Sequence, residues 1–131
     1  MRDKPLILVV DDEPDLLEIM TVNLSRSGFD PVAARNAREG IDATKKLRPD
    51  LVLMDVKMPG ETGTDAALAI KQDPELKDIK IAFLSNMKDP WPTTSASREM
   101  LAKELGMEDF IEKTADWPTT LAKIQEILAK K

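Results

Sequence analysis

The chain has 131 residues, of which 42% are hydrophobic and 33% charged, and its formal net charge is −5 at pH 7. These values predict one domain over residues 1–131 with a substantial core, and the negative charge argues against nucleic acid as a direct partner. Cysteine and histidine are both absent, which excludes disulfides, thiol catalysis and imidazole-based metal sites, and no apolar stretch reaches the length of a membrane span. We therefore expect a cytoplasmic protein without a membrane partner.

Strand-like and helix-like patterns alternate along the chain. The apolar runs at 6–10 and 51–54 are typical of strands buried on both faces of a parallel sheet, and weaker patterns predict further strands at 31–34, 79–84 and 109–112. Pro31 restricts its strand to a sheet edge. Helical spacing and capping residues predict helices at about 14–28, 36–47, 64–72, 95–105 and 119–130. The five strand–helix units predict an α/β domain whose doubly wound parallel sheet is covered on both faces by five helices.

Acidic residues follow two of these strands. Asp11 and Asp12 come directly after the first apolar run, and Asp55 after the run at 51–54. Because ligands of such sheets bind beyond the carboxyl ends of the strands, we expect these carboxylates to share one crevice. Two unit charges about 4 Å apart repel by roughly 4 kcal/mol at an effective dielectric constant near 20, so the cluster needs a counter-charge. Mg²⁺, or Mn²⁺ in its place, is the predicted one. The simpler explanation, favourable acidic charge at a helix N-terminus, suffices for Asp15 and Glu13.

Four motifs in this order resemble the receiver domain of two-component response regulators: VVDDEPD, LVLMDVKMPGETG, IAFLSN and DFIEK. The resemblance covers essentially the whole chain and implies the flavodoxin-like strand order 2-1-3-4-5. It further implies that Asp55 is the phosphoryl acceptor, since a carboxylate can act as a nucleophile towards phosphorus. By the same resemblance, Asp11, Asp12, Asp55 and the backbone carbonyl of Lys57 hold the metal, with Asp12 the more direct ligand of the acidic pair.

The resemblance also assigns residues on the last two strands. Lys113 matches the lysine that pairs with the phosphoryl group. Ser85 matches the hydroxyl that moves to bond the phosphate, and Phe110 matches the aromatic residue whose rotamer reports that movement; simple core packing is the other interpretation of Phe110.

The implied function is a signalling switch that catalyses its own phosphorylation and dephosphorylation. A histidine kinase or phosphotransfer protein donates the phosphoryl group, and the face formed by the segments at 95–105, 109–112 and 119–130 changes shape for a downstream protein target. We expect a monomer or weak dimer. The sequence leaves open the cognate kinase and whether the domain stands alone or belongs to a longer regulator or hybrid kinase.

Three features depart from the family pattern. Thr114 replaces the usual proline after Lys113, so we expect a trans peptide bond, because a cis bond before a non-proline residue costs about 3 kcal/mol. The segment between Ser85 and Lys113 is long, with the excess at 86–94, where we expect Trp91 to pack on the following helix rather than contact a partner. Lys57 and Met87 should hinder attack by water and give a long-lived phosphoryl state.

Three other functions are alternatives to a phosphorylated receiver domain. A phosphorylation-independent, receiver-like interaction module is the strongest alternative, because the proline is missing and the loop is unusual. A flavodoxin-type electron carrier needs a loop that accepts a phosphate after the first strand, where Asp11, Asp12 and Glu13 would repel it. A haloacid-dehalogenase-type phosphatase usually has a second aspartate at the position that Lys57 occupies.

Overall fold

The computed structural model describes residues 3–55, 63–85, 109–113 and 115–129. Five parallel strands form one sheet in the order β2-β1-β3-β4-β5, which confirms the expected topology. The strands are β1 (Leu6–Val10), β2 (Asp30–Ala34), β3 (Leu51–Asp55), β4 (Lys80–Ser85) and β5 (Asp109–Glu112). The strand containing Pro31 lies at the sheet edge, where a missing backbone N–H is tolerated.

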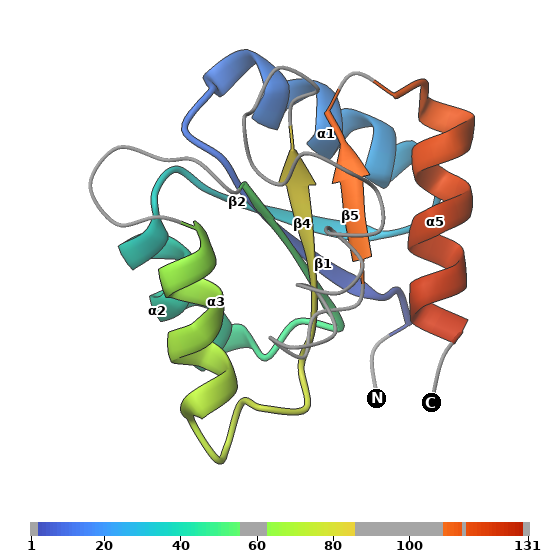
Figure 1. Cartoon of the computed structure of the whole chain (residues 1–131). Helices are drawn as coiled ribbons and strands as arrows, with labels where there is room; N and C mark the ends of the chain where they lie inside the picture. Colours follow the sequence, from blue (N-terminus) through green and yellow to red (C-terminus); the bar gives the residue numbers. More distant parts are fainter. Residues whose placement is uncertain (1–2, 56–62, 86–108, 114, 130–131) are drawn as a thin grey trace.

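Four helices are described, two on each face of the sheet (Figure 1). They are α1 (Pro14–Arg26), α2 (Ala37–Leu47), α3 (Gly63–Gln72) and α5 (Trp117–Ala129). One apolar cluster joins α2 and α3 to the face that presents Leu8, Val52 and Phe83. A second cluster joins α1 and α5 to the opposite face, which presents Ile7, Leu53 and Ile111. The predicted helix at 95–105 lies outside the described residues.

Local sequence signals explain most helix boundaries. Pro14 occupies the first turn of α1, where its missing N–H costs no hydrogen bond. Gly28 follows that helix with φ of +93°, a left-handed conformation that glycine adopts without strain. The side chain of Asn36 accepts the Glu39 N–H at 2.9 Å and caps α2 as expected. Helix α5 begins at Trp117, two residues earlier than predicted, since Pro118 is tolerated in a first turn.

One close packing contact fixes α2 against the sheet. A Cβ atom on Gly40 would lie only 2.8 Å from Cγ2 of Val10, which is fully buried in β1. The glycine therefore lets the helix approach the strand that precedes Asp11. None of the described helices is long and apolar enough to cross a membrane.

Candidate functional site

Three carboxylates gather at the carboxyl ends of two neighbouring strands. Asp11 directly follows β1 and Asp55 is the last residue of β3, and these strands pair through Val10 and Met54. Asp11, Asp12 and Asp55 each offer a carboxylate oxygen, and the three atoms all lie within 4.8 Å of one another. Asp11 and Asp55 are buried, whereas Asp12 is exposed to solvent. The expected acidic crevice is therefore present, with one of its carboxylates open to the outside.

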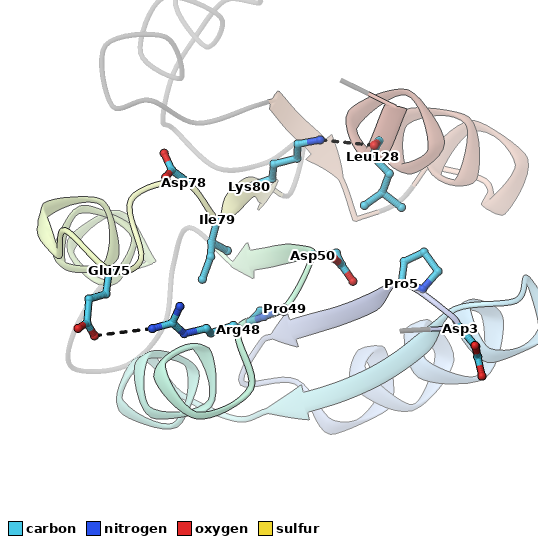
Figure 2. A pocket seen from close by; sticks show the side chains of 10 residues that line it. All are labelled: Asp3, Pro5, Arg48, Pro49, Asp50, Glu75, Asp78, Ile79, Lys80 and Leu128. Atoms are coloured by element: carbon cyan, nitrogen blue, oxygen red, sulfur yellow. Dashed lines mark hydrogen bonds and ion pairs between the residues drawn. The ribbon is translucent and has the colours of Figure 1, made fainter. Parts of the chain in front are cut away.

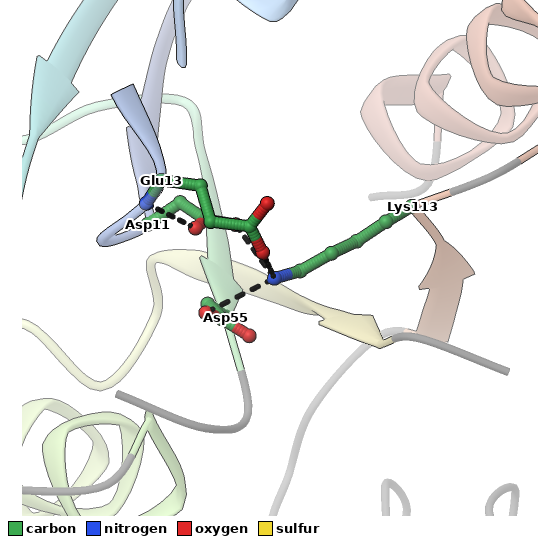
Figure 3. Close-up of polar contacts among 4 residues, drawn as sticks. All are labelled: Asp11, Glu13, Asp55 and Lys113. Carbon is green, nitrogen blue, oxygen red and sulfur yellow. Dashed lines mark hydrogen bonds and ion pairs between the residues drawn. The ribbon is translucent and has the colours of Figure 1, made fainter. Parts of the chain in front are cut away.

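Lys113 reaches this crevice from β5. Its Nζ lies 3.0 Å from Oδ2 of Asp11 and 3.1 Å from Oδ2 of Asp55, and its side chain is only 10% exposed (Figure 3). One ammonium thus bridges two buried carboxylates that lie at the ends of different strands. The sequence argument assigned the counter-charge to a divalent cation; the structure shows that Lys113 supplies part of it.

Glu13 is a member of this site that the sequence analysis missed. Its Oε1 lies 3.2 Å from Nζ of Lys113, although 61% of the Glu13 side chain is exposed (Figure 3). The acid was assigned to the N-terminus of α1, where it stands at the N-cap position, but its side chain makes no capping hydrogen bond. The sequence did contain a signal for this position: an aspartate side chain often accepts the N–H two residues later in a turn. Here Oδ1 of Asp11 accepts the Glu13 N–H at 2.9 Å. That bond folds the chain so that Glu13 faces Lys113.

Burial and charge act in opposite directions on these groups. Burial raises the pKa of Asp11 above its ordinary value, and the Glu13 N–H and the Lys113 ammonium only partly oppose that rise. For Lys113, burial alone would lower the pKa, but hydrogen bonding and attraction to Asp11 and Asp55 outweigh it and raise the pKa above the usual range. Lys113 is therefore a permanent cation at this site, and the carboxylates compete for it.

The donor set fits a hard divalent cation. All three donors are carboxylate oxygens, the ligand type that Mg²⁺ prefers, and Mg²⁺ keeps several of its waters, so few protein ligands are needed. Three carboxylates, those of Asp11, Asp55 and Glu13, contact the ammonium of Lys113, and Asp12 lies close by, so negative charge exceeds positive charge among the described residues of the site. Asp12 is the donor that solvent reaches most easily. The fourth predicted ligand, the carbonyl of Lys57, lies outside the described residues.

The structure describes the remaining predicted residues only in part. Ser85 ends β4 and pairs in register with Glu112, while Phe110 pairs with Phe83, but neither predicted side chain is described. Met87 and Trp91 lie outside the described residues, as does Thr114, so the predicted trans bond and the long-lived phosphoryl state stay predictions.

Comparisons with known proteins agree with this geometry. Residues 7–125 match the family described as "Response regulator receiver domain". The chain is 34% identical over 107 residues to the DNA-binding response regulator MtrA of Mycolicibacterium smegmatis. The aligned region covers 82% of this chain but only 43% of the length of MtrA. It is 31% identical over 123 residues to the protein PilH of Pseudomonas aeruginosa, covering 94% of this chain and 97% of PilH.

A solved structure shows the same fold. A putative response regulator from Chloroflexus aurantiacus matches with a TM-score of 0.85 and 25% identity, covering 98% of this chain and all of that one. The fold, the acidic crevice with its lysine, and the match to the family over residues 7–125 lead to one conclusion. The chain belongs to the receiver domains of response regulators, the family of two-component signalling.

Proposed function

We propose that Asp55 accepts a phosphoryl group from a histidine kinase or phosphotransfer protein. The observation that carries the proposal is the meeting of three carboxylates within 4.8 Å, two of them contacted by the same ammonium. A purely structural ion pair would need one carboxylate for one ammonium. Here excess negative charge is concentrated around one buried carboxylate at the end of a central strand.

The chemistry follows from the contacts of Asp55. Its carboxylate attacks the phosphorus of the donor, a bond forms between carboxylate oxygen and phosphorus, and the bond from phosphorus to the donor's leaving group breaks. Asp11, Asp12 and Asp55 would hold Mg²⁺, which when bound draws charge off the transferring group. Lys113 lies 3.1 Å from Asp55 and is placed to pair with an oxygen of the phosphoryl group once it is attached.

The consequence is a switch. Phosphorylation gives Lys113 a new anionic partner and so changes its competition between Asp11, Asp55 and Glu13. We expect Ser85 and Phe110 to respond and the face that includes β5 and α5 to bind a downstream protein in a cytoplasmic pathway.

The test is phosphorylation by a small acyl phosphate, with and without Mg²⁺, followed as the fraction of labelled protein. Wild type should be labelled only with Mg²⁺, and Asp55→Asn should remain unlabelled. Asp12→Asn should need much more Mg²⁺. The matched control is Asp15→Asn, which removes an exposed acid from the first turn of α1 and should behave as wild type. Unlabelled wild type, or full labelling of Asp55→Asn, would refute the proposal; the first of these results would favour a phosphorylation-independent interaction module.

A further inference from the structure

The segment between β5 and α5 carries Lys113 but lacks the proline that usually follows this lysine. We propose that Trp117 and Ser27 are positioning residues, which hold this segment against α1 and thereby keep the Lys113 ammonium over Asp55. The inference rests on the proposed function of Lys113 and names the contact that supports it in this chain.

The contact is a hydrogen bond between elements 90 residues apart in sequence. Nε1 of Trp117, in the first turn of α5, donates to Oγ of Ser27 at 3.1 Å. Ser27 is a firm anchor, because it is the C-cap of α1 and its own N–H bonds to carbonyls of the last helical turn. The indole packs against the apolar cluster between the sheet and α1. A partly buried tryptophan N–H that has found a partner gives a rigid, directional contact.

The other hydrogen bonds of this segment are local. The Ala115 N–H donates to the Glu112 carbonyl at 3.2 Å, and the Thr119 N–H donates to Oδ1 of Asp116 at 3.0 Å. Hydrogen bonding from the Thr119 side chain, and then from its N–H, lowers the pKa of Asp116. Both bonds are local: the first joins Ala115 to the adjacent end of β5, and the second lies at the start of α5. Among the described residues, the bond from Trp117 to Ser27 is the hydrogen bond that ties residues 115–120 to an element other than β5 and α5, which they connect.

The packing between this segment and α1 is not continuous. A cavity of about 60 Å³ lies between α1 and this segment, lined on the segment side by Lys113, Ala115 and Trp117. On the helix side its walls include Leu16 and Met20. Within the part of the chain that the structure describes, this hollow interrupts the van der Waals contact between the segment and α1, so a directional bond adds a constraint on the distance between them. The tryptophan hydrogen bond supplies that constraint.

The constraint reaches Lys113 because Trp117 lies only four positions further along the chain, a span of at most about 14 Å of extended chain. Lysine carries its charge on a flexible four-carbon stem, so the ammonium is held in place only if its backbone is held too. Releasing Trp117 would let Lys113 exchange among Asp11, Glu13 and solvent instead of staying beside Asp55. The hydrogen bond between Trp117 and Ser27 thus restricts the backbone after Lys113, as a proline at position 114 would.

The experiment compares Trp117→Phe and Ser27→Ala with wild type in the whole chain. Each variant should lower the phosphorylation rate at saturating small acyl phosphate by about fivefold, and the double variant should be no slower than either single one. Ser27→Thr keeps a hydroxyl that can accept from Nε1 of Trp117, so this variant should be phosphorylated at the wild-type rate. Ser25→Ala removes an exposed hydroxyl from the same helix and is the matched control. The affinity for Mg²⁺, which depends on the carboxylates, should be unchanged in all of them.

A second measurement does not depend on phosphorylation. Solvent exchange of the Lys113 ammonium protons, followed by ¹⁵N NMR without donor, should be slow in wild type and faster in Trp117→Phe and Ser27→Ala. Wild-type rates and wild-type exchange in both variants would overturn the inference. A lower melting temperature without a change in either measurement would also overturn it, since that is the result of a merely structural contact. Unlabelled wild type would instead refute the proposed function, and the exchange measurement would still test the anchor.

Discussion

The two ends of the parallel sheet use charged side chains in different ways. At the carboxyl end, Asp11 and Asp55 are buried, and both contact the ammonium of Lys113, whose side chain is 10% exposed (Figure 3). At the amino end, charged residues surround a much larger cavity of about 1070 Å³, whose walls include Arg48, Asp50, Glu75, Asp78 and Lys80 (Figure 2). Both ends are therefore rich in charged side chains, and they differ in what those side chains contact.

Charged groups at the amino end bind the backbone. Oδ2 of Asp50 accepts the Leu6 N–H at 2.7 Å, and Nζ of Lys80 donates to the carbonyls of Ile127 and Leu128 at 3.0 and 3.4 Å. Arg48 and Glu75 form an exposed ion pair at 3.8 Å (Figure 2). These contacts complete the hydrogen bonding of strand starts and a helix end. Charge that satisfies the backbone stabilises the fold, whereas buried charge that faces other charge can be redirected by a ligand or a covalent group.

The largest change in the free energy of unfolding should come from replacing the lysine at each end of the sheet by alanine. Lys113→Ala leaves two buried carboxylates without their shared ammonium and should lower the free energy of unfolding by about 3 kcal/mol in metal-free buffer. Lys80→Ala removes hydrogen bonds from a half-buried lysine and should cost only about 1.5 kcal/mol. Denaturant unfolding with and without Mg²⁺ measures both, and Mg²⁺ should stabilise Lys113→Ala more than wild type. If both variants lose the same free energy of unfolding, or if Mg²⁺ stabilises Lys113→Ala no more than wild type, the proposed difference between the two ends is wrong.

A pH-dependent effect should follow at Asp11. Its pKa is raised in the folded protein, so the folded state binds the proton more tightly than the unfolded state does. The resulting stability is fully present below the ordinary pKa of 3.8 and is lost as pH rises through the folded-state pKa. Without metal, Asp11→Asn should therefore be more stable than wild type at pH 7, and this advantage should shrink towards pH 3.5. Urea unfolding across this range, with EDTA present, tests the sign; a variant that is less stable at pH 7 contradicts it.

A smaller loss is expected from Asp50 at the amino end. Asp50→Ala removes the acceptor of the Leu6 N–H and should cost about 1 kcal/mol. Because this carboxylate acts on the backbone and not on the site, the phosphorylation rate should stay at the wild-type value. A change in that rate would show that the two ends of the sheet are coupled.

The smallest effect is expected at the exposed ion pair. The side chains of Arg48 and Glu75 are 61% and 77% exposed, so solvent screens their attraction. Glu75→Gln should change the free energy of unfolding by less than about 0.5 kcal/mol, and added salt should not alter that result. Thermal or denaturant unfolding at low and high salt checks it, and a loss above 1 kcal/mol would mean that the pair is stronger than its exposure suggests.

The sequence predicts the acidic half of the site better than the basic half. Unbroken apolar runs identify β1 and β3, and a parallel sheet then brings Asp11 and Asp55 together by topology alone. Lys113 follows a short strand without such a pattern, and only the family resemblance indicated its role. The contacts of Glu13 and Trp117 depend on how a turn and a helix sit in three dimensions, which no local periodicity encodes.

The proposed function depends on which residue carries the phosphoryl group. Wild-type protein labelled by a small acyl phosphate in the presence of Mg²⁺ should be digested and its peptides sequenced by mass spectrometry. The account predicts a single modified residue, Asp55, which has Lys113 as its neighbour at 3.1 Å. A phosphoryl group on any other residue, or the same label in the absence of Mg²⁺, would contradict it.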